Sequence, residues 1–275
     1  MKPPVTRSSH QLDSLTPVEV AARLQHLPGL VFFDTAGNLP NGYGNPVSIV
    51  AAAPTQVIRG SISDPGDRQR LRQSLAERSS GPAADRGFPL GGLCGWVDYE
   101  GDFVFGDYPQ MLVHTHDGGW HECGSLSDEL STPVHQPVDL GRIEAGWTKS
   151  RFEGAVERIR EWIAAGDIYQ VNLAQCFELA VKGGSLFPLY EALRNASPSP
   201  MAAWMSLAGR EVLSSSPETF LRISGNGIET RPIKGTRPRF ADPAADLQSA
   251  YELQTSPKEI AELVMITDLL RNDIG

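Results

Sequence analysis

The chain has 275 residues, of which 40% are hydrophobic, and its formal net charge at pH 7 is -9. This length and hydrophobic content are enough to bury a large core in one or two domains, and they exclude a disordered chain. The acidic pI of about 5.2 argues against nucleic acid and anionic membranes as main partners, because both select basic surfaces.

No apolar run approaches the roughly 18 residues that a membrane span needs, and the polar sequence after Met1 is not the core of a signal peptide. We therefore expect a cytoplasmic protein. Three cysteines at scattered positions, Cys94, Cys123 and Cys176, fit reduced thiols better than a disulfide framework. His121-Glu122-Cys123 has no second ligand pair nearby, which argues against a metal site there.

Short helices and strands are predicted over the first 124 residues. Thr16-Pro17-Val18-Glu19 is a capping box with proline at the first helical position. Apolar runs bounded by turn-forming residues predict strands, and the glycine-rich stretch 91–96 is interpreted as a bulged core strand because no helix follows it. The predicted elements are a helix from Thr16, strands at 30–34, 47–53, 56–59 and 88–99, and a surface helix at 67–77.

A stretch rich in Ser, Pro, Asp and Glu, residues 125–147, is the predicted linker to a second domain, residues 148–275. Ser150-Arg151-Phe152-Glu153 reads as a second capping box, and the helix it opens is predicted to end at Gly166. From Tyr169 to Val181, apolar and polar residues alternate, which predicts a long strand. The amides of its polar face either border a site or face solvent.

A helix at 186–195 and a hairpin over 201–214 are predicted next. A second hairpin, with strands at 220–223 and 228–233, is predicted to turn at Asn226-Gly227. Counting back from that turn places Glu218 opposite Gly235, beside Lys234. Geometry alone thus predicts a carboxyl group next to this lysine.

The loop that follows this hairpin, residues 231–239, carries four cations in an acidic chain. Two prolines and a glycine give it a defined shape, and its charge favours an anionic ligand. Lys234 lies among arginines, whose positive field favours the neutral amine, and a neutral amine is a nucleophile. The alternative is a solvated basic turn on the surface.

Ser256-Pro257-Lys258-Glu259 is a third capping box and opens the last predicted helix. Glu259 and Glu262 lie one turn apart on one face of that helix. Two carboxylates so placed form half of a site for Mg²⁺, which takes oxygen ligands and keeps several waters. In the alternative, Glu259 caps the helix and Glu262 faces solvent.

Four motifs in this order resemble the chorismate-utilising enzymes. The resemblance implies an α+β fold of orthogonally packed β-sheets flanked by helices, with an N-terminal domain at 1–124 and the chorismate-binding domain at 148–275. It also implies a bound Mg²⁺ ion and ammonia delivered by a separate glutaminase subunit. The motifs are Gly166-Asp167-Ile168-Tyr169-Gln170-Val171-Asn172, Ser216-Pro217-Glu218, the segment from Pro232 to Arg239, and the segment from Glu262 to Asp273.

Lysine at position 234 is similar to the aminodeoxychorismate synthases of this family, whereas its anthranilate, isochorismate and salicylate enzymes typically have alanine there. The resemblance implies that Lys234 is the nucleophile toward chorismate and Glu218 the general acid. It further implies that Thr236 and the Gly235 backbone contact the substrate. Glu259 and Glu262 would hold the metal. The N-terminal domain in this family often holds an indole-type effector such as tryptophan.

The family's chorismate-binding domain continues into segments that supply further metal carboxylates and substrate-binding residues, which this sequence lacks. We therefore expect these 275 residues alone to be a fragment with little or no activity. Two other interpretations stay open. One is an anthranilate synthase-like enzyme in which Lys234 is incidental. The other is a non-catalytic module that retains an effector pocket or a glutaminase-docking surface.

Overall fold

The computed structural model describes residues 6–8, 12–36, 46–78, 88–89, 91–116, 119–133 and 137–275. Within them the architecture is α+β, as predicted, with antiparallel sheets and six α-helices. The chain divides into two units, which are described separately. Unit 1 is Met1–Val134 with Tyr190–Gly275, and unit 2 is His135–Leu189.

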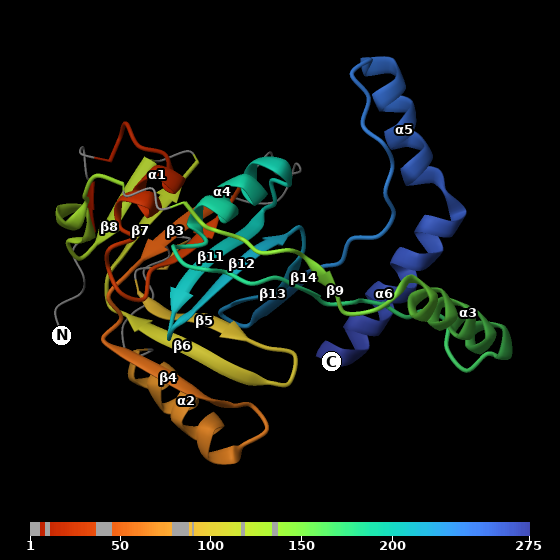
Figure 1. Ribbon diagram of the computed structural model, residues 1–275, viewed down its shortest axis with the longest axis horizontal. Helices are drawn as coiled ribbons and strands as arrows, with labels where there is room; N and C mark the ends of the chain where they lie inside the picture. The colour runs from red at the N-terminus through yellow and green to blue at the C-terminus, as the bar shows by residue number, and fades with distance from the viewer. Residues whose placement is uncertain are drawn as a thin grey trace. The chain divides into compact units, whose positions relative to one another are not determined.

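The largest element of unit 1 is an antiparallel sheet of seven strands (Figure 1). It joins segments that are far apart in the sequence, since Val31 pairs with Met205. The sheet therefore combines strands from both predicted domains, and the predicted domain boundaries stay a prediction. Its strands, in spatial order, are β1 (Thr6–Ser8), β8 (Gly119–Cys123), β7 (Met111–Thr115), β3 (Val47–Ala51), β2 (Val31–Asp34), β11 (Met201–Leu207) and β12 (Arg210–Ser216).

A second sheet of three strands, β4 (Gln56–Ser61), β6 (Asp102–Tyr108) and β5 (Gly92–Val97), belongs to the same unit. Helix α2 (Pro65–Arg78) packs on β4 and β5, and α1 (Pro17–Arg23) packs on β2 and β3 (Figure 1). The capping box predicted for α1 is confirmed, because the Thr16 amide donates to Glu19 Oε2 at 2.8 Å.

The hydrophobic core of unit 1 joins residues of both sheets. Tyr108 of β6 is fully buried, and its hydroxyl donates to the Gly29 carbonyl oxygen at 2.6 Å. The glycine-rich strand β5 passes very close to β6, since a Cβ on Gly95 would lie 1.9 Å from the Val104 carbonyl oxygen. Glycine at position 95 permits this close approach of the two backbones. The central buried cluster consists of Val31, Ala51, Tyr108, Met111, Val113 and Met205.

Unit 2 contains α3 (Lys149–Ala165) and the short paired strands β9 (Glu144–Ala145) and β10 (Phe177–Glu178). The predicted capping box at Ser150 is wrong, because the N-cap is Thr148, whose Oγ1 accepts from the Arg151 amide at 3.3 Å. The predicted end of this helix is confirmed at Gly166, which adopts a left-handed φ of 82°.

The long strand predicted from Tyr169 to Val181 is wrong. Only β10 is a strand, paired with β9, and a single further bridge joins Val181 to Leu140. Alternation shows which side chains share a face, but a strand also needs a neighbouring backbone for its hydrogen bonds. Within the described part of unit 2, only residues 139–146 supply such backbone pairing.

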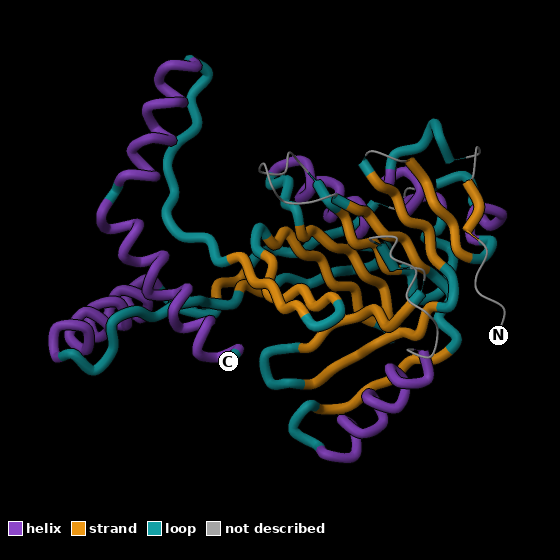
Figure 2. Tube along the Cα trace, turned by 180° about the vertical axis from the view of Figure 1, so that it is seen from behind, coloured by secondary structure: helices purple, strands orange, loops and turns teal. Residues whose placement is uncertain are grey.

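The remaining elements are the helix before β11, a hairpin that follows β12, and two consecutive helices after that hairpin. Ser256 alone separates the last two helices (Figure 2). It caps the second of them, as predicted, because its Oγ accepts from the Glu259 amide. The first of the two was not predicted, although Asp242 caps it and Pro243 opens it. These elements are α4 (Phe187–Ala196), β13 (Thr219–Ser224), β14 (Gly227–Arg231), α5 (Pro243–Thr255) and α6 (Pro257–Ile274).

Candidate functional site

The β13–β14 hairpin positions the first predicted catalytic residue, with a corrected register. The turn consists of Gly225 and Asn226, one residue earlier than predicted, because Ser224 pairs with Gly227. Gly225 has a φ of 57°, a conformation that glycine adopts without strain at the first position of a tight hairpin turn. After an irregularity in the ladder, Thr219 pairs with Arg231. Extended by one residue, this register places Glu218 opposite residue 232, and not opposite residue 235.

Glu218 nevertheless reaches the chain next to Lys234. Its Oε1 accepts a hydrogen bond from the backbone amide of Ile233 at 3.2 Å. The hydrogen bond fixes this carboxyl group at the point where β14 runs into the basic loop. The sequence predicted that Glu218 lies next to Lys234. In the structure, Glu218 contacts Ile233, the residue just before Lys234.

The basic loop, residues 231–239, has no helix or strand beyond Arg231. Each of its three arginines lies beside a carboxylate. Arg231 Nε is 2.5 Å from Glu229 Oε1, Arg237 Nη1 is 3.4 Å from Glu259 Oε1, and Arg239 Nε is 2.8 Å from Asp246 Oδ1. The prediction of a neutral Lys234 relied on the positive charge of these arginines. Each of them is paired with a carboxylate, which offsets that charge.

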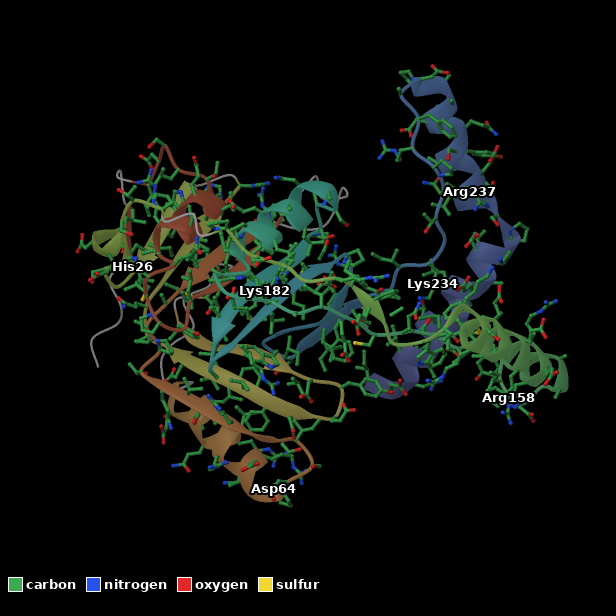
Figure 3. The ribbon with its side chains drawn as sticks, viewed as in Figure 1. His26, Asp64, Arg158, Lys182, Lys234 and Arg237 are labelled. Atoms are coloured by element: carbon green, nitrogen blue, oxygen red, sulfur yellow. The ribbon has the colours of Figure 1, made fainter. Side chains whose placement is uncertain are left out.

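Lys234 itself is half-buried, and Figure 3 shows it on the loop between β14 and α5. Among the residues that the structure describes, its amine has neither a hydrogen-bond partner nor an ion pair. Thr236, two residues on, is exposed. An amine without a fixed partner is free to meet an incoming ligand, and this is the property that a lysine nucleophile needs.

Gly235 brings the loop against the first turn of α6. It has a φ of 78°, which disfavours a side chain, and a Cβ at this position would lie 2.8 Å from Glu259 Oε2 and 2.7 Å from Leu253 Cδ1. The predicted substrate-contacting Gly235 and the predicted metal-binding Glu259 are therefore in contact. Only a residue without a Cβ fits here without displacing the carboxylate.

Glu259 and Glu262 of α6 are the two carboxylates predicted to form half of a magnesium site. The Glu259 side chain is 15% exposed, and Glu262 lies one helical turn further along the same helix. Mg²⁺ needs only one or two protein carboxylates when waters and a substrate complete its shell. Across the described ranges, no group of three or more His, Cys, Asp or Glu side chains is placed to hold a metal. The assignment of Glu259 and Glu262 to a metal ion stays a prediction.

Sequence reasoning missed a buried polar cluster in unit 1. Asp34 at the end of β2 is 2% exposed, and its Oδ2 accepts from the Tyr190 hydroxyl at 3.0 Å and from Arg194 Nε at 2.5 Å. Burial beside the Asp34 carboxylate raises the pKa of Tyr190 above its usual range. Tyr190 and Arg194, four residues apart in the predicted helix, were the available signal.

A cavity of about 430 Å³ lies elsewhere in unit 1, between the three-stranded sheet and the turn that joins β11 to β12. Its lining includes Arg59, Trp96, Asp102 and Arg210. None of the predicted site residues lines it. The candidate site is therefore the loop and its carboxylates, and not this cavity.

Comparison with known proteins assigns the family. The chorismate binding enzyme family matches residues 110–275, which include the β13–β14 hairpin, the basic loop, Glu259 and Glu262. The chain belongs to this family. The prediction drawn from the four motifs is thereby confirmed at the level of the family.

Curated relatives carry two different names. The chain is 36% identical over 216 residues to anthranilate synthase component 1 of Methanothermobacter thermautotrophicus, an alignment of 69% of this chain and 46% of that protein. It is 41% identical over 187 residues to aminodeoxychorismate synthase component 1 of Salmonella typhimurium, covering 63% of this chain and 40% of that protein. The chain thus spans less than half the length of these relatives.

Solved structures show the same fold. Anthranilate synthase component I from Streptococcus pneumoniae has a TM-score of 0.65 at 23% identity, over 98% of this chain and 68% of that one. The menaquinone-specific isochorismate synthase MenF from Escherichia coli has a TM-score of 0.66 at 16% identity, over 96% of this chain and 63% of that one. The predicted fold is confirmed. Across the described residues, none of the helices is both long and apolar enough to cross a membrane.

Proposed function

We propose that this protein is the large subunit of an aminodeoxychorismate synthase. It would convert chorismate and ammonia to 4-amino-4-deoxychorismate, the precursor of 4-aminobenzoate and folate. The observation that carries this proposal is the position of Lys234. It is a half-buried residue on the basic loop, and the Glu218 carboxyl group accepts a hydrogen bond from the backbone amide of the preceding residue, Ile233. The family match and the aminodeoxychorismate synthase relative support it.

In the proposed reaction, the amine of Lys234 adds to C2 of chorismate through its nitrogen lone pair as the C4 hydroxyl group leaves. Glu218 donates a proton to this hydroxyl, which departs as water. Ammonia then forms a bond to C4, the bond between C2 and Lys234 breaks, and the amine is regenerated. Thr236 and the Gly235 backbone would contact the substrate. The first step needs a carboxylic acid and an amine within reach of one ring.

Glu259 and Glu262 would hold a Mg²⁺ ion, which supplies positive charge for a carboxylate of the substrate when bound. Ammonia would come from glutamine through a separate glutaminase subunit, a proposal that the designation component 1 of the relatives supports. An indole-type effector such as tryptophan in the N-terminal region stays a prediction.

A second candidate is an anthranilate synthase-like activity. The relative from Methanothermobacter thermautotrophicus, at 36% identity, favours it. The two reactions share chorismate and ammonia but give different products. Product identity therefore separates them.

The test is a single-turnover assay with the protein at a concentration comparable to that of chorismate, in the presence of Mg²⁺ and ammonium. A single-turnover assay detects even a low rate. We expect 4-amino-4-deoxychorismate from the native protein and none from Lys234→Ala. Lys182→Ala is the matched control, since Lys182 Nζ lies 3.5 Å from Asp139 Oδ2 in unit 2. Formation of anthranilate, or full activity of Lys234→Ala, would reject the proposal.

A further inference from the structure

Arg237 links the basic loop to the acidic face of α6. Its Nη1 donates to Glu259 Oε1 at 3.4 Å and to the Thr236 carbonyl oxygen at 3.1 Å. The arginine side chain is 34% exposed and the glutamate side chain 15% exposed. This ion pair therefore engages a carboxylate that the proposed function assigns to a metal ion. Figure 3 shows Arg237 on the loop, beyond Lys234.

The other two arginines of the loop have different partners. Arg231 pairs with Glu229 on its own strand. Arg239 donates twice to Asp246 in the first turn of α5, from Nε and Nη2, both at 2.8 Å, and these bonds lower the pKa of that carboxyl group. Neither acid belongs to the predicted metal pair. Among these arginines, Arg237 is thus the one whose partner is a predicted metal ligand.

Arg237 engages one of the two carboxylate oxygens of Glu259. One oxygen, Oε1, faces the guanidinium of Arg237, and the other, Oε2, lies against Gly235. A guanidinium and a divalent ion cannot share one carboxylate oxygen without strong repulsion. A metal ion that binds Glu259 through Oε1 must therefore displace Arg237.

We propose that Arg237 is a positioning residue that occupies Glu259 until a divalent cation takes its place. The inference rests on one part of the proposed function, namely that Glu259 and Glu262 bind the cation. The displaced guanidinium stays on the loop, three residues from Lys234, where it can pair with a carboxylate of an anionic substrate. Cation binding thus prepares the loop for the substrate, and the two binding events favour each other.

Calorimetric titration with Mg²⁺, and with Mn²⁺ as a second probe, tests this proposal in the absence of chorismate. Removing the competing charge in Arg237→Gln should tighten cation binding by up to about fivefold, the range expected for a partly exposed ion pair. Arg239→Gln is the matched control and should bind the cation as the native protein does. Glu262→Gln should weaken binding in both the native and the Arg237→Gln background.

The sign of the change decides the outcome. If Arg237 merely held Glu259 in the geometry for the metal, Arg237→Gln would bind the cation more weakly, and that result overturns the proposal. Unchanged affinity, an equal change in Arg239→Gln, or no cation binding by the native protein would overturn it as well. Thermal unfolding by circular dichroism verifies that the variants fold. Because no product is scored, failure here is distinct from failure of the proposed amination.

Discussion

The seven-stranded sheet and the C-terminal segment, residues 217–275, use similar apolar patterns but differ in burial. Phe32 of β2 is fully buried, whereas Phe220 of β13 is 77% exposed. Helix α1 buries three consecutive residues, while α6 buries none. Ser249 is the single buried residue between 217 and 275, a range that the structure describes completely. Periodicity thus reveals which residues share a face, but not whether that face meets a partner.

The comparison also separates stability from function. The buried core belongs to the region of the two sheets, whereas the residues of the proposed reaction lie on the hairpin, the loop and α6. Substitutions in the first region should therefore change the free energy of unfolding. Substitutions in the second should change ligand binding and affect unfolding less.

The largest expected effect comes from a matched pair of phenylalanines. Phe32→Ala removes a buried ring that meets Tyr190 edge-on, with centroids 5.9 Å apart, and should lower the free energy of unfolding by about 3–5 kcal/mol. Phe220→Ala should change it by about 0.5 kcal/mol or less, because the ring is mostly exposed. Urea unfolding measures both. Equal losses for the two variants would show that the C-terminal segment is packed as tightly as the sheet.

Asp34→Asn tests the buried polar cluster. The change leaves Arg194 without its counter-ion, and because that arginine side chain is 25% exposed, the expected loss is about 1–3 kcal/mol. Asp246→Asn, which breaks the exposed pair with Arg239 in the C-terminal segment, should cause a smaller loss. Urea unfolding again serves as the measurement. A larger loss of unfolding free energy for Asp246→Asn than for Asp34→Asn would contradict this difference between the two regions.

Gly235→Ala tests the close contact between the loop and α6. The left-handed backbone should cost about 1–2 kcal/mol locally, and the new methyl group must displace the Glu259 carboxylate. We expect weaker Mg²⁺ binding by calorimetry. Gly225→Ala is the control, because its φ is also positive at 57° but nothing lies within 4 Å of its added Cβ. Equal weakening in both variants would assign the effect to the backbone alone.

The smallest effect is a pH dependence confined to the sheet region. Burial, with smaller contributions from the charges of His116 and His121, lowers the pKa of His114. The unfolded chain, with a histidine pKa of about 6.5, then binds more protons than the folded one. Stability should therefore fall as the pH drops below about 6.5. His114→Gln should flatten this slope in urea unfolding, whereas a slope unchanged by the substitution would exclude His114 as its source.

Local sequence signals predicted most elements of both regions. The caps at Thr16 and Ser256, the helix end at Gly166 and the strands of both hairpins were recognised from residues close in sequence. Such features depend on hydrogen bonds within a few residues, and these are legible in the sequence. The hairpin turn was predicted one residue too late because Gly225-Asn226 and Asn226-Gly227 both contain the residue types that favour a tight turn.

Features that depend on distant partners were not predicted. The pairing of β2 with β11 and the contact of Asp34 with Arg194 join residues about 160 to 170 positions apart, and no local pattern encodes them. The alternation from Tyr169 to Val181 predicted a strand, but a strand forms only where a neighbour completes its ladder. For the candidate site, the sequence predicted that Glu218 lies near Lys234, while the pairing of Arg237 with Glu259 required the structure.

Covalent trapping at Lys234 tests the central claim most directly. The native protein would be incubated with chorismate and Mg²⁺ without ammonia, quenched and analysed by peptide mass spectrometry. We predict a ring adduct on the peptide that contains Lys234, with none on that peptide in the Lys234→Ala variant. An adduct on a different lysine, or amination that proceeds with position 234 never modified, would contradict the account.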